Sequence, residues 1–220
     1  MKKFFLFMSW CCLLSLLSGC SLSNKEGIST FDETVYATID DKTIWSHCEL
    51  IDHNGVDTQG YPHPITSTSI YLSSYNTLNK KDAKLITELP LIAVDSAGRE
   101  VLTRVTDITP ANNNWIVIEE YLAAADWNQG SIRIIGMNLE TKEQRAIASG
   151  GRSGGLNFKY MVKGNYVFWS EKALDETRES AIMNLLTGEK QTLVGVDYDS
   201  KVVIENGIIN ADDKVISIEI

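Results

Sequence analysis

The chain has 220 residues, 44% of them hydrophobic, and carries 20 basic and 29 acidic side chains for a net charge of −9. A surface this acidic repels the phosphates of nucleic acids and the head groups of anionic lipids, so nucleic acid is excluded as a partner. The length suits one domain that buries roughly 70% of the surface of its unfolded chain, so folding requires no metal or disulfide.

The first 19 residues have the three parts of a secretory signal peptide. Two lysines near the N-terminus are followed by an apolar stretch from Phe4 to Leu17 and then by two small residues before Cys20. This order is typical of an export signal. The apolar stretch is too short for a transmembrane helix, which needs about 20 residues to cross the bilayer. The sequence therefore predicts an exported protein.

Residues 17–20, Leu-Ser-Gly-Cys, resemble the bacterial lipobox, in which the cysteine receives a diacylglycerol and becomes the new N-terminus. The resemblance implies an extracytoplasmic lipoprotein attached through Cys20 to the cell membrane or the outer membrane. Two or three acyl chains would satisfy the requirement that stable anchoring takes more than one. Ser21 favours outer-membrane sorting if the source is Gram-negative. The alternative is an ordinary secreted protein with a cysteine near its cleavage site.

Without residues 1–19 the chain keeps 18 basic and 29 acidic side chains, a net charge of −11, and the only cysteine besides Cys20 is Cys48. A lone thiol forms no internal disulfide, and we expect Cys48 to be a small buried hydrophobic side chain. Residues 20–33 are mostly polar and unpatterned, which indicates a flexible tether. The folded domain is expected over residues 34–220.

Short apolar segments, rich in β-branched and aromatic residues, predict strands in that domain. They are Ile70–Leu72, Trp115–Ile118, Ile132–Ile135, Tyr166–Trp169, Val202–Ile204 and Val215–Ile218. Turn signals separate them, at residues 95–98, 110–114, 163–165, 187–189 and 205–207. This pattern indicates an all-β sandwich, barrel or propeller. The apolar residues of Lys172–Leu186 have near-helical spacing, but an internal repeat favours a strand over residues 180–185.

The internal repeat joins two segments of similar sequence. Met137–Glu143 is repeated 46 residues later as Met183–Glu189, and an aromatic-led strand precedes each copy, at Trp115 and at Tyr166. Residues 75–82 are a looser copy. Each unit is interpreted as a strand, a loop, a second strand ending in Asn-Leu, a turn and a third strand. One such sheet cannot bury both faces alone, so we expect neighbouring sheets to stack on it.

These turns resemble those of β-propellers of the TolB and prolyl-oligopeptidase N-terminal type. Residues 184–189 (NLLTGE) fit well, residues 138–143 (NLETKE) fairly and residues 76–82 poorly. The resemblance implies a partial or four- to five-unit propeller-like array of antiparallel sheets, fewer than the six or seven blades usual in that family. A strand over Thr34–Ile39 could complete the short last unit, Val196–Ile220, and close a ring; otherwise the array is open.

Gly151–Gly155 matches the G-x-S-x-G pattern of a hydrolase nucleophile elbow around Ser153. That elbow joins a strand to a helix, and its histidine follows the serine in the chain. All three histidines precede Ser153, and the residues that follow, 156–162, alternate as in a strand. We therefore expect a glycine-rich loop, and a hydrolase stays an alternative.

A second candidate site is the run from His47 to His63, which holds Cys48, several carboxylates and all three histidines, His47, His53 and His63. These are the ligand types of zinc and copper. Their spacing fits no standard metal motif, and His47 and Cys48 would point to opposite faces of a strand. We expect a turn-rich loop and no cofactor, with a metal site as the alternative.

The third candidate is a set of aromatic side chains. Trp115 and Trp169 lie within apolar strands and are expected in the core, whereas Trp127, Tyr61 and Tyr121 are candidates for an exposed binding surface. The sequence thus favours a non-enzymatic, lipid-anchored binding or scaffold domain with a protein or glycan partner at the cell envelope. The alternatives are an envelope enzyme that uses Ser153 or the His47–His63 loop, and a sensor of small solutes.

Overall fold

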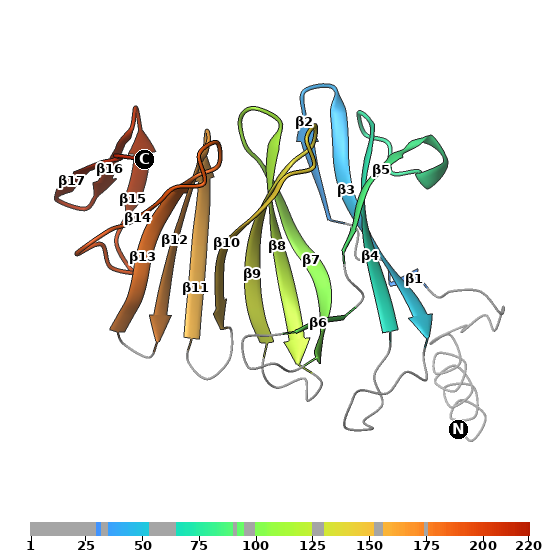
Figure 1. The fold of residues 1–220 in the computed structure, drawn as a ribbon, viewed down its shortest axis with the longest axis horizontal. Helices are drawn as coiled ribbons and strands as arrows, with labels where there is room; N and C mark the ends of the chain where they lie inside the picture. Colours follow the sequence, from blue (N-terminus) through green and yellow to red (C-terminus); the bar gives the residue numbers. More distant parts are fainter. Residues whose placement is uncertain are drawn as a thin grey trace, which may run out of the picture.

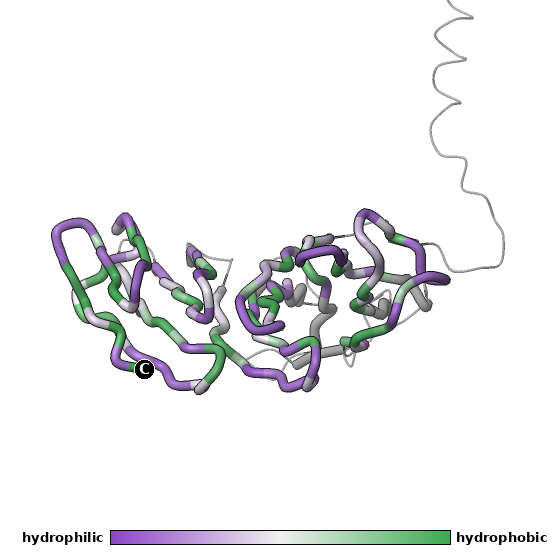
Figure 2. Tube along the Cα trace, turned by 90° about the horizontal axis from the view of Figure 1, so that it is seen from above, coloured by the Kyte–Doolittle hydropathy of each residue, from purple (hydrophilic) through white to green (hydrophobic). Residues whose placement is uncertain are grey.

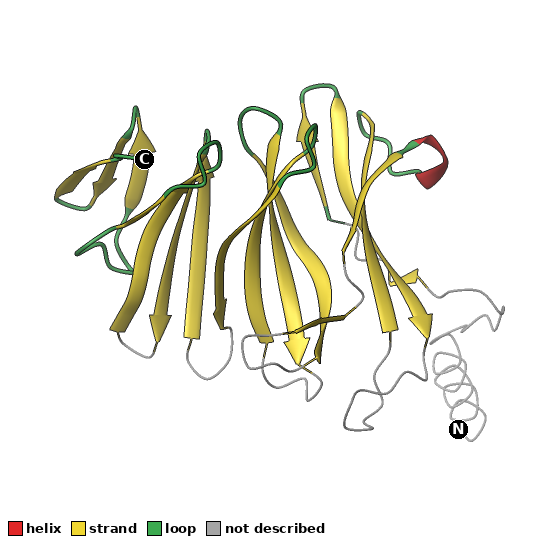
Figure 3. Cartoon of the chain, in the orientation of Figure 1, coloured by secondary structure: helices red, strands yellow, loops and turns green. Residues whose placement is uncertain are grey.

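The computed structural model describes residues 30–31, 35–52, 65–89, 92–94, 100–124, 130–151, 156–173 and 176–220. This part of the chain is all-β, as predicted, and forms four antiparallel sheets (Figures 1 and 3). The helical structure within it is one short 3₁₀ turn, η1 (Lys80–Asp82). None of the described segments forms a helix with the length and apolar character needed to cross a membrane.

The sheets follow one another along the chain. The first sheet contains β1 (Thr30–Phe31), β2 (Tyr36–Ile39), β3 (Lys42–Asp52), β4 (Ile65–Ser74) and β5 (Lys84–Leu89). The second contains β6 (Ile92–Val94), β7 (Glu100–Pro110), β8 (Trp115–Ala124), β9 (Gly130–Asn138) and β10 (Gln144–Gly151). The third contains β11 (Leu156–Lys163), β12 (Tyr166–Ala173), β13 (Glu176–Asn184) and β14 (Lys190–Thr192). The fourth contains β15 (Val202–Glu205), β16 (Ile208–Ala211) and β17 (Lys214–Ser217).

Within each sheet, strands that are consecutive in the chain pair side by side, except that β1 and β2 both pair with β3. All six predicted strands are confirmed, although β17 ends one residue before Ile218. Residues 180–184 of the segment with helical spacing lie in a strand, β13, because β12 and β14 pair with its two edges and the second and fourth sheets bury its two faces. Ahead of the expected three-strand unit, the second sheet has two further strands, β6 and β7, and the third sheet has one, β11.

The strands of the second and third sheets are apolar on both faces because another sheet covers each face. In β8, Trp115 and Val117 pack toward the third sheet, whereas Ile116 and Ile118 pack toward the first. All four side chains are buried. Since side chains alternate between the two faces of a strand, burial of both faces produces a continuous apolar run.

Three hydrophobic clusters fill the three spaces between successive sheets. The cluster between the first and second sheets contains Ile44, Ile70, Ile86, Leu89, Val105, Ile108, Ile116, Ile118 and Met137. The cluster between the second and third contains Trp115, Val117, Ile132, Ile134, Ile147, Val167, Trp169, Ala181, Met183 and Leu185. The cluster between the third and fourth contains Phe168, Ile182, Leu193, Val196, Ile204, Ile209 and Ala211. The predicted stacking of sheets is thus confirmed, and Cys48 is a buried free thiol, as expected.

The stack does not close into a ring. Figures 1 and 2 show the first sheet at one end of the long axis and the C-terminus with the fourth sheet at the other. The strand expected over Thr34–Ile39 could have completed the last unit, but β2 pairs with β3 in the first sheet instead. The two-residue turn Asp40-Asp41 makes this hairpin local, and pairing with a distant strand would require closing a far longer loop. Of the two arrangements that the sequence left open, closure of a ring by this strand is therefore excluded.

One backbone hydrogen bond recurs in all four sheets. The residue directly after a strand donates its N–H to the carbonyl of the second residue in a neighbouring hairpin turn. The pairs are Tyr75 to Asp41 (3.0 Å), Leu139 to Asn114 (2.8 Å), Leu185 to Asn165 (2.7 Å) and Ile218 to Gly207 (2.8 Å). The four sheets therefore share this contact between the end of one strand and a neighbouring hairpin turn, and these turns lie on the same edge of the stack (Figure 1).

Candidate functional site between the second and third sheets

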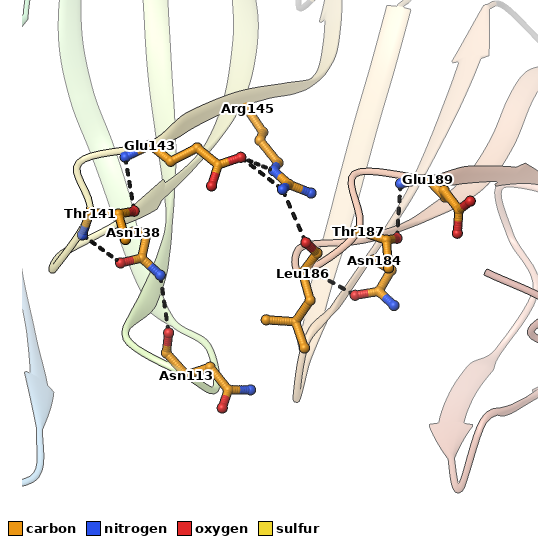
Figure 4. A network of polar contacts seen from close by, with 9 residues as sticks. All are labelled: Asn113, Asn138, Thr141, Glu143, Arg145, Asn184, Leu186, Thr187 and Glu189. Atoms are coloured by element: carbon orange, nitrogen blue, oxygen red, sulfur yellow. Dashed lines mark hydrogen bonds and ion pairs between the residues drawn. The ribbon is translucent and has the colours of Figure 1, made fainter.

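The two copies of the repeated sequence motif are the turns β9–β10 and β13–β14. In the first, the side-chain oxygen of Asn138 accepts hydrogen bonds from the backbone N–H groups of Glu140 and Thr141, both at 3.0 Å, and Thr141 Oγ1 accepts one from the N–H of Glu143. In the second, Asn184 Oδ1 accepts from Leu186 at 2.9 Å and Thr187 Oγ1 from Glu189 (Figure 4). Asn and Thr recur because their side chains satisfy the backbone of the turn.

The two turns differ at two positions, Glu140 against Leu186 and Lys142 against Gly188, and the second of these concerns the backbone. Lys142 in the first copy and Gly188 in the second both have positive φ angles, 66° and 79°. Glycine adopts this conformation without the steric cost that a side chain incurs. The second turn therefore adopts this backbone conformation with less strain than the first.

Arg145 of β10 ties the second sheet to the third. Its Nε donates to Glu143 at 2.8 Å, and one terminal nitrogen donates to the carbonyl of Leu186 at 3.0 Å (Figure 4). The guanidinium lies 5.1 Å from the ring centroid of Trp115. A Cβ atom on Gly188 would lie only 2.6 Å from the other terminal nitrogen. Gly188 thus provides both the backbone conformation of its turn and the space for Arg145.

A pocket of about 230 Å³ opens between β10 of the second sheet and the third sheet. Its lining comes from all four strands of the third sheet and from three consecutive residues of β10. The lining residues are Ile147, Ala148, Ser149, Phe158, Trp169, Glu171, Glu179 and Lys190. Drug-sized ligands occupy pockets of about 300–1,000 Å³, so this pocket suits a single side chain or a small ion.

Cross-strand pairing places aromatic and acidic side chains together in this pocket. Phe158, Glu171 and Glu179 are direct neighbours across β11, β12 and β13, and Trp169 lies two residues before Glu171 on the same face of β12. Gly150 of β10 borders this group, because a Cβ atom there would lie 2.6 Å from Phe158 and 3.4 Å from a Glu171 oxygen. The pocket therefore has an aromatic floor with carboxylates beside it.

One cation of the chain already occupies part of this arrangement. Lys190 Nζ lies 4.8 Å from the ring centroid of Trp169 and 2.6 Å from Glu179 Oε1. The Glu171 carboxylate, by contrast, has neither a hydrogen bond nor an ion pair with any residue in the described ranges. The pocket thus holds two carboxylates and one internal cation, and a half-buried negative charge is left over.

A second charged group lies in the core beside the first sheet. Glu120 of β8 is fully buried, and its Oε2 accepts a hydrogen bond from Arg133 Nε at 2.6 Å. Its other oxygen is buried without a hydrogen-bond partner in the part of the chain that the structure describes. Burial raises the pKa of Glu120, while the charge and hydrogen bond of Arg133 act in the opposite direction.

Tyr160 of β11 connects the third sheet to the second. Its hydroxyl donates to Asp107 Oδ2 of β7 at 2.5 Å, and Thr109 donates to the same oxygen at 2.8 Å. Burial, and then the hydrogen bond to Asp107, raise the pKa of the Tyr160 hydroxyl far above its ordinary value. Tyr160 therefore stays protonated and acts as a fixed link between two sheets.

Two of the candidate residues from the sequence lie among the described residues. Tyr121 is a half-buried side chain of β8, and the Arg104 guanidinium lies 5.3 Å from its ring centroid. His47 is half-buried in β3 with its ring edge against Trp45, at a centroid distance of 6.2 Å. Neither residue lines the pocket between the second and third sheets. Across the described ranges, no group of three or more His, Cys, Asp or Glu side chains is placed to hold a metal ion.

The other candidates lie outside the described residues. They are Cys20, His53, Tyr61, His63, Trp127 and Ser153. The segment after Ser153 is the strand β11, as its alternation predicted, whereas a nucleophile elbow is followed by a helix.

The pocket residues Phe158, Glu171, Glu179 and Lys190 were not predicted from the sequence. Trp169 was predicted to lie in the core, and its side chain is only 2% exposed. The spacing Trp-x-Glu in β12 shows that Trp169 and Glu171 share a face. The register that brings Glu179 and Phe158 to the same place carries no signal in a single sequence.

The fold and the pocket together define an all-β protein of four stacked antiparallel sheets, with a small aromatic and acidic pocket between two of them. No protein-family model matches the chain, and neither a curated protein nor a solved structure shows significant similarity to it.

Proposed function

We propose that this chain is an extracytoplasmic bacterial lipoprotein, anchored through Cys20, whose folded part binds a protein or glycan partner at the cell envelope without catalysing a reaction. The observation that carries the binding function is the pocket between the second and third sheets, in which aromatic and charged side chains meet on a rigid stack. The export signal and the lipobox-like residues 17–20 support the location.

We also infer that the stack is an open, propeller-like array. Apart from β1, consecutive strands pair in order within each sheet, as they do in a propeller blade, and the Asn-Leu-x-Thr turns recur at the same place in the second and third sheets. Stacked blades bury both faces of each inner sheet, and the hydrophobic clusters have this arrangement. An array of this kind holds surface groups at fixed distances from one another, as a preorganised binding surface requires.

The location is tested by following the mature protein. Wild-type chain expressed in a bacterium should partition with membranes and carry fatty acid on Cys20, as shown by mass spectrometry of its N-terminal peptide. Cys20→Ser should remove the fatty acid and release the protein from the membrane or leave it unprocessed. Mature wild-type protein with a free Cys20 thiol would contradict the proposal.

The binding function is tested by capture followed by direct measurement. Tagged full-length chain in detergent should retain a component of the cell envelope, and the purified component should then bind the chain by calorimetry. Both Cys20→Ser and wild-type protein should bind, because the pocket lies far along the chain from the anchor. A captured component with no measurable affinity once purified would reject the assignment.

A further inference from the structure

We propose that the pocket between β10 and the third sheet receives the ammonium or guanidinium group of a lysine or arginine side chain from the partner. This inference rests on the proposed binding function and narrows the partner to a protein with an exposed basic residue. The inference is based on the aromatic ring of Trp169 and the carboxylates of Glu171 and Glu179, which line this pocket together.

The pocket already holds an organic cation from the chain itself. The ammonium of Lys190 lies over the face of Trp169 and pairs with Glu179, which are the two contacts that stabilise a cation on an aromatic ring beside a carboxylate. The geometry that a basic ligand needs is therefore present and in use. Lys190 is an exposed side chain, so it can move aside without breaking the core.

Glu171 provides the attraction for a second cation. It lies next to Glu179 across β12 and β13 and next to Phe158 across β11 and β12. Since Lys190 pairs with Glu179, the Glu171 charge stays uncompensated among the described residues. Two neighbouring carboxylates, of which only Glu179 is paired with a cation, favour the arrival of another positive charge.

The volume of the pocket and the net charge of the protein indicate which kind of ligand fits. A volume of about 230 Å³ is below the usual range for a metabolite, so a single side-chain head group fits better than a sugar ring with its neighbours. The net charge of −9 attracts cations and repels anions over longer distances. Both properties favour a basic side chain of a protein partner.

The test uses the full-length chain in a non-ionic detergent with single-residue probes. N-acetyl-arginine methylamide and N-acetyl-lysine methylamide should shift the backbone NMR signals of Gly150, Glu171 and Lys190 with a Kd on the order of millimolar. The neutral isostere N-acetyl-citrulline methylamide should leave these signals unchanged. Equal shifts with citrulline, or shifts with glucose in place of the basic probes, would overturn the inference.

Three variants sharpen the test. Glu171→Gln keeps the shape of the side chain and should weaken binding of the arginine probe about fivefold or more, because the uncompensated charge is gone. Lys190→Met removes the internal competitor and should strengthen binding about twofold to fivefold. Glu205→Gln, which removes a carboxylate from the exposed edge of the fourth sheet, is the matched control and should bind as the wild type does.

The outcome separates this inference from the proposed function. If a captured envelope protein binds Glu171→Gln as tightly as wild type, the binding function stands and the pocket is not the contact. If the probes bind as expected but no envelope component is captured, the pocket recognises cations and the partner assignment fails. An unchanged affinity in Lys190→Met would show that Lys190 does not compete for the site, and would also count against the inference.

Discussion

The third and fourth sheets show how position in the stack shapes a strand. In β12 of the third sheet, Val167, Phe168 and Trp169 are buried in succession, because the second sheet covers one face and the fourth sheet the other. In β16 of the fourth sheet, buried Ile209 and Ala211 alternate with exposed neighbours. The fourth sheet is covered on one face only, and its other face carries side chains such as Val203 and Val215, which are 38% and 71% exposed.

The difference indicates unequal stability along the stack. Each inner sheet is stabilised by two hydrophobic interfaces, whereas the fourth sheet depends on the single cluster that it shares with the third. In stacked repeats, stability is approximately the sum of each unit and its interfaces with its neighbours. The fourth sheet should therefore open before the second and third do.

The largest expected effect on the free energy of unfolding comes from removing a large buried side chain from that single interface. Phe168→Ala removes a side chain that is 1% exposed in the cluster between the third and fourth sheets, and should lower the free energy of unfolding by about 3–5 kcal/mol. The matched control is Val203→Ala, on the outward face of the fourth sheet, which should cost less than about 1 kcal/mol. Urea titration followed by circular dichroism measures both.

Hydrogen exchange on Phe168→Ala shows where the loss falls. The amides of Ile204 and Ile209 in the fourth sheet should lose protection, while those of Ile116 and Val117 in the second should keep it. Equal loss of protection at all four amides would mean that the sheets unfold as one unit, and the contrast between inner and outer sheets would be wrong.

A smaller effect is expected from a polar pair in the same interface. Ser170 and Ser180 are buried cross-strand neighbours in β12 and β13, with their hydroxyl oxygens 2.8 Å apart. Ser170→Ala leaves the Ser180 hydroxyl buried and unpaired, which should cost about 1–3 kcal/mol. The double variant with Ser180→Ala should cost less than the sum of the two single changes, because no unpaired hydroxyl remains. Strict additivity in a double-mutant cycle would show that the two hydroxyls do not interact.

Much of this stack was predictable from the sequence, because inner strands that are buried on both faces have continuous runs of apolar residues. Trp115–Ile118 and Tyr166–Trp169 signalled strands directly. The turns at residues 163–165 and 205–207 were predictable as well, because their glycine and asparagine residues favour positive φ angles, as observed at Gly164 and Asn206. Local chemistry was sufficient for these features.

The pocket was not predictable, because it depends on register and on which sheet faces which. Glu171 and Glu179 are eight positions apart in the chain and become neighbours only through the pairing of β12 with β13. Strand β7 was not predicted, because it has no continuous apolar run. Its apolar residues, such as Val105 and Ile108, are separated by polar residues, and a bulge interrupts their two-residue alternation. Residues 34–39 do not close a ring with the last sheet, because the local hairpin with β3 already pairs this strand in the first sheet.

The ionisation of Glu120 gives a pH-dependent contrast between the first interface and the others. Because burial raises its pKa in the folded state, the folded chain binds more protons at this site than the unfolded chain does. Its contribution to the free energy of unfolding should therefore fall as the pH rises above about 4.5, by at most about 1.4 kcal/mol per pH unit. Urea titrations at several pH values, compared with Glu120→Gln, measure this slope.

In the Glu120→Gln variant the site no longer titrates, so the stability difference from wild type should shift in favour of the variant as the pH rises from about 4.5 toward neutrality. The ion pair with Arg133 limits this shift, because it stabilises the charged form. A difference that stays constant between pH 4.5 and pH 8 would mean that Arg133 fully offsets the burial of Glu120.

The smallest effect concerns the two repeated turns, at the position where the first copy has lysine and the second has glycine. Gly188→Ala forces a side chain into a left-handed conformation and against the Arg145 guanidinium, and should cost about 1–2 kcal/mol. Lys142→Gly at the equivalent position removes the side chain that disfavours the positive φ angle, and should raise the free energy of unfolding by up to about 1 kcal/mol. The shifts in urea midpoint should thus have opposite signs. A gain from Gly188→Ala would show that the backbone of this turn differs from its copy, and the equivalence of the two sheets would then hold only for the strands.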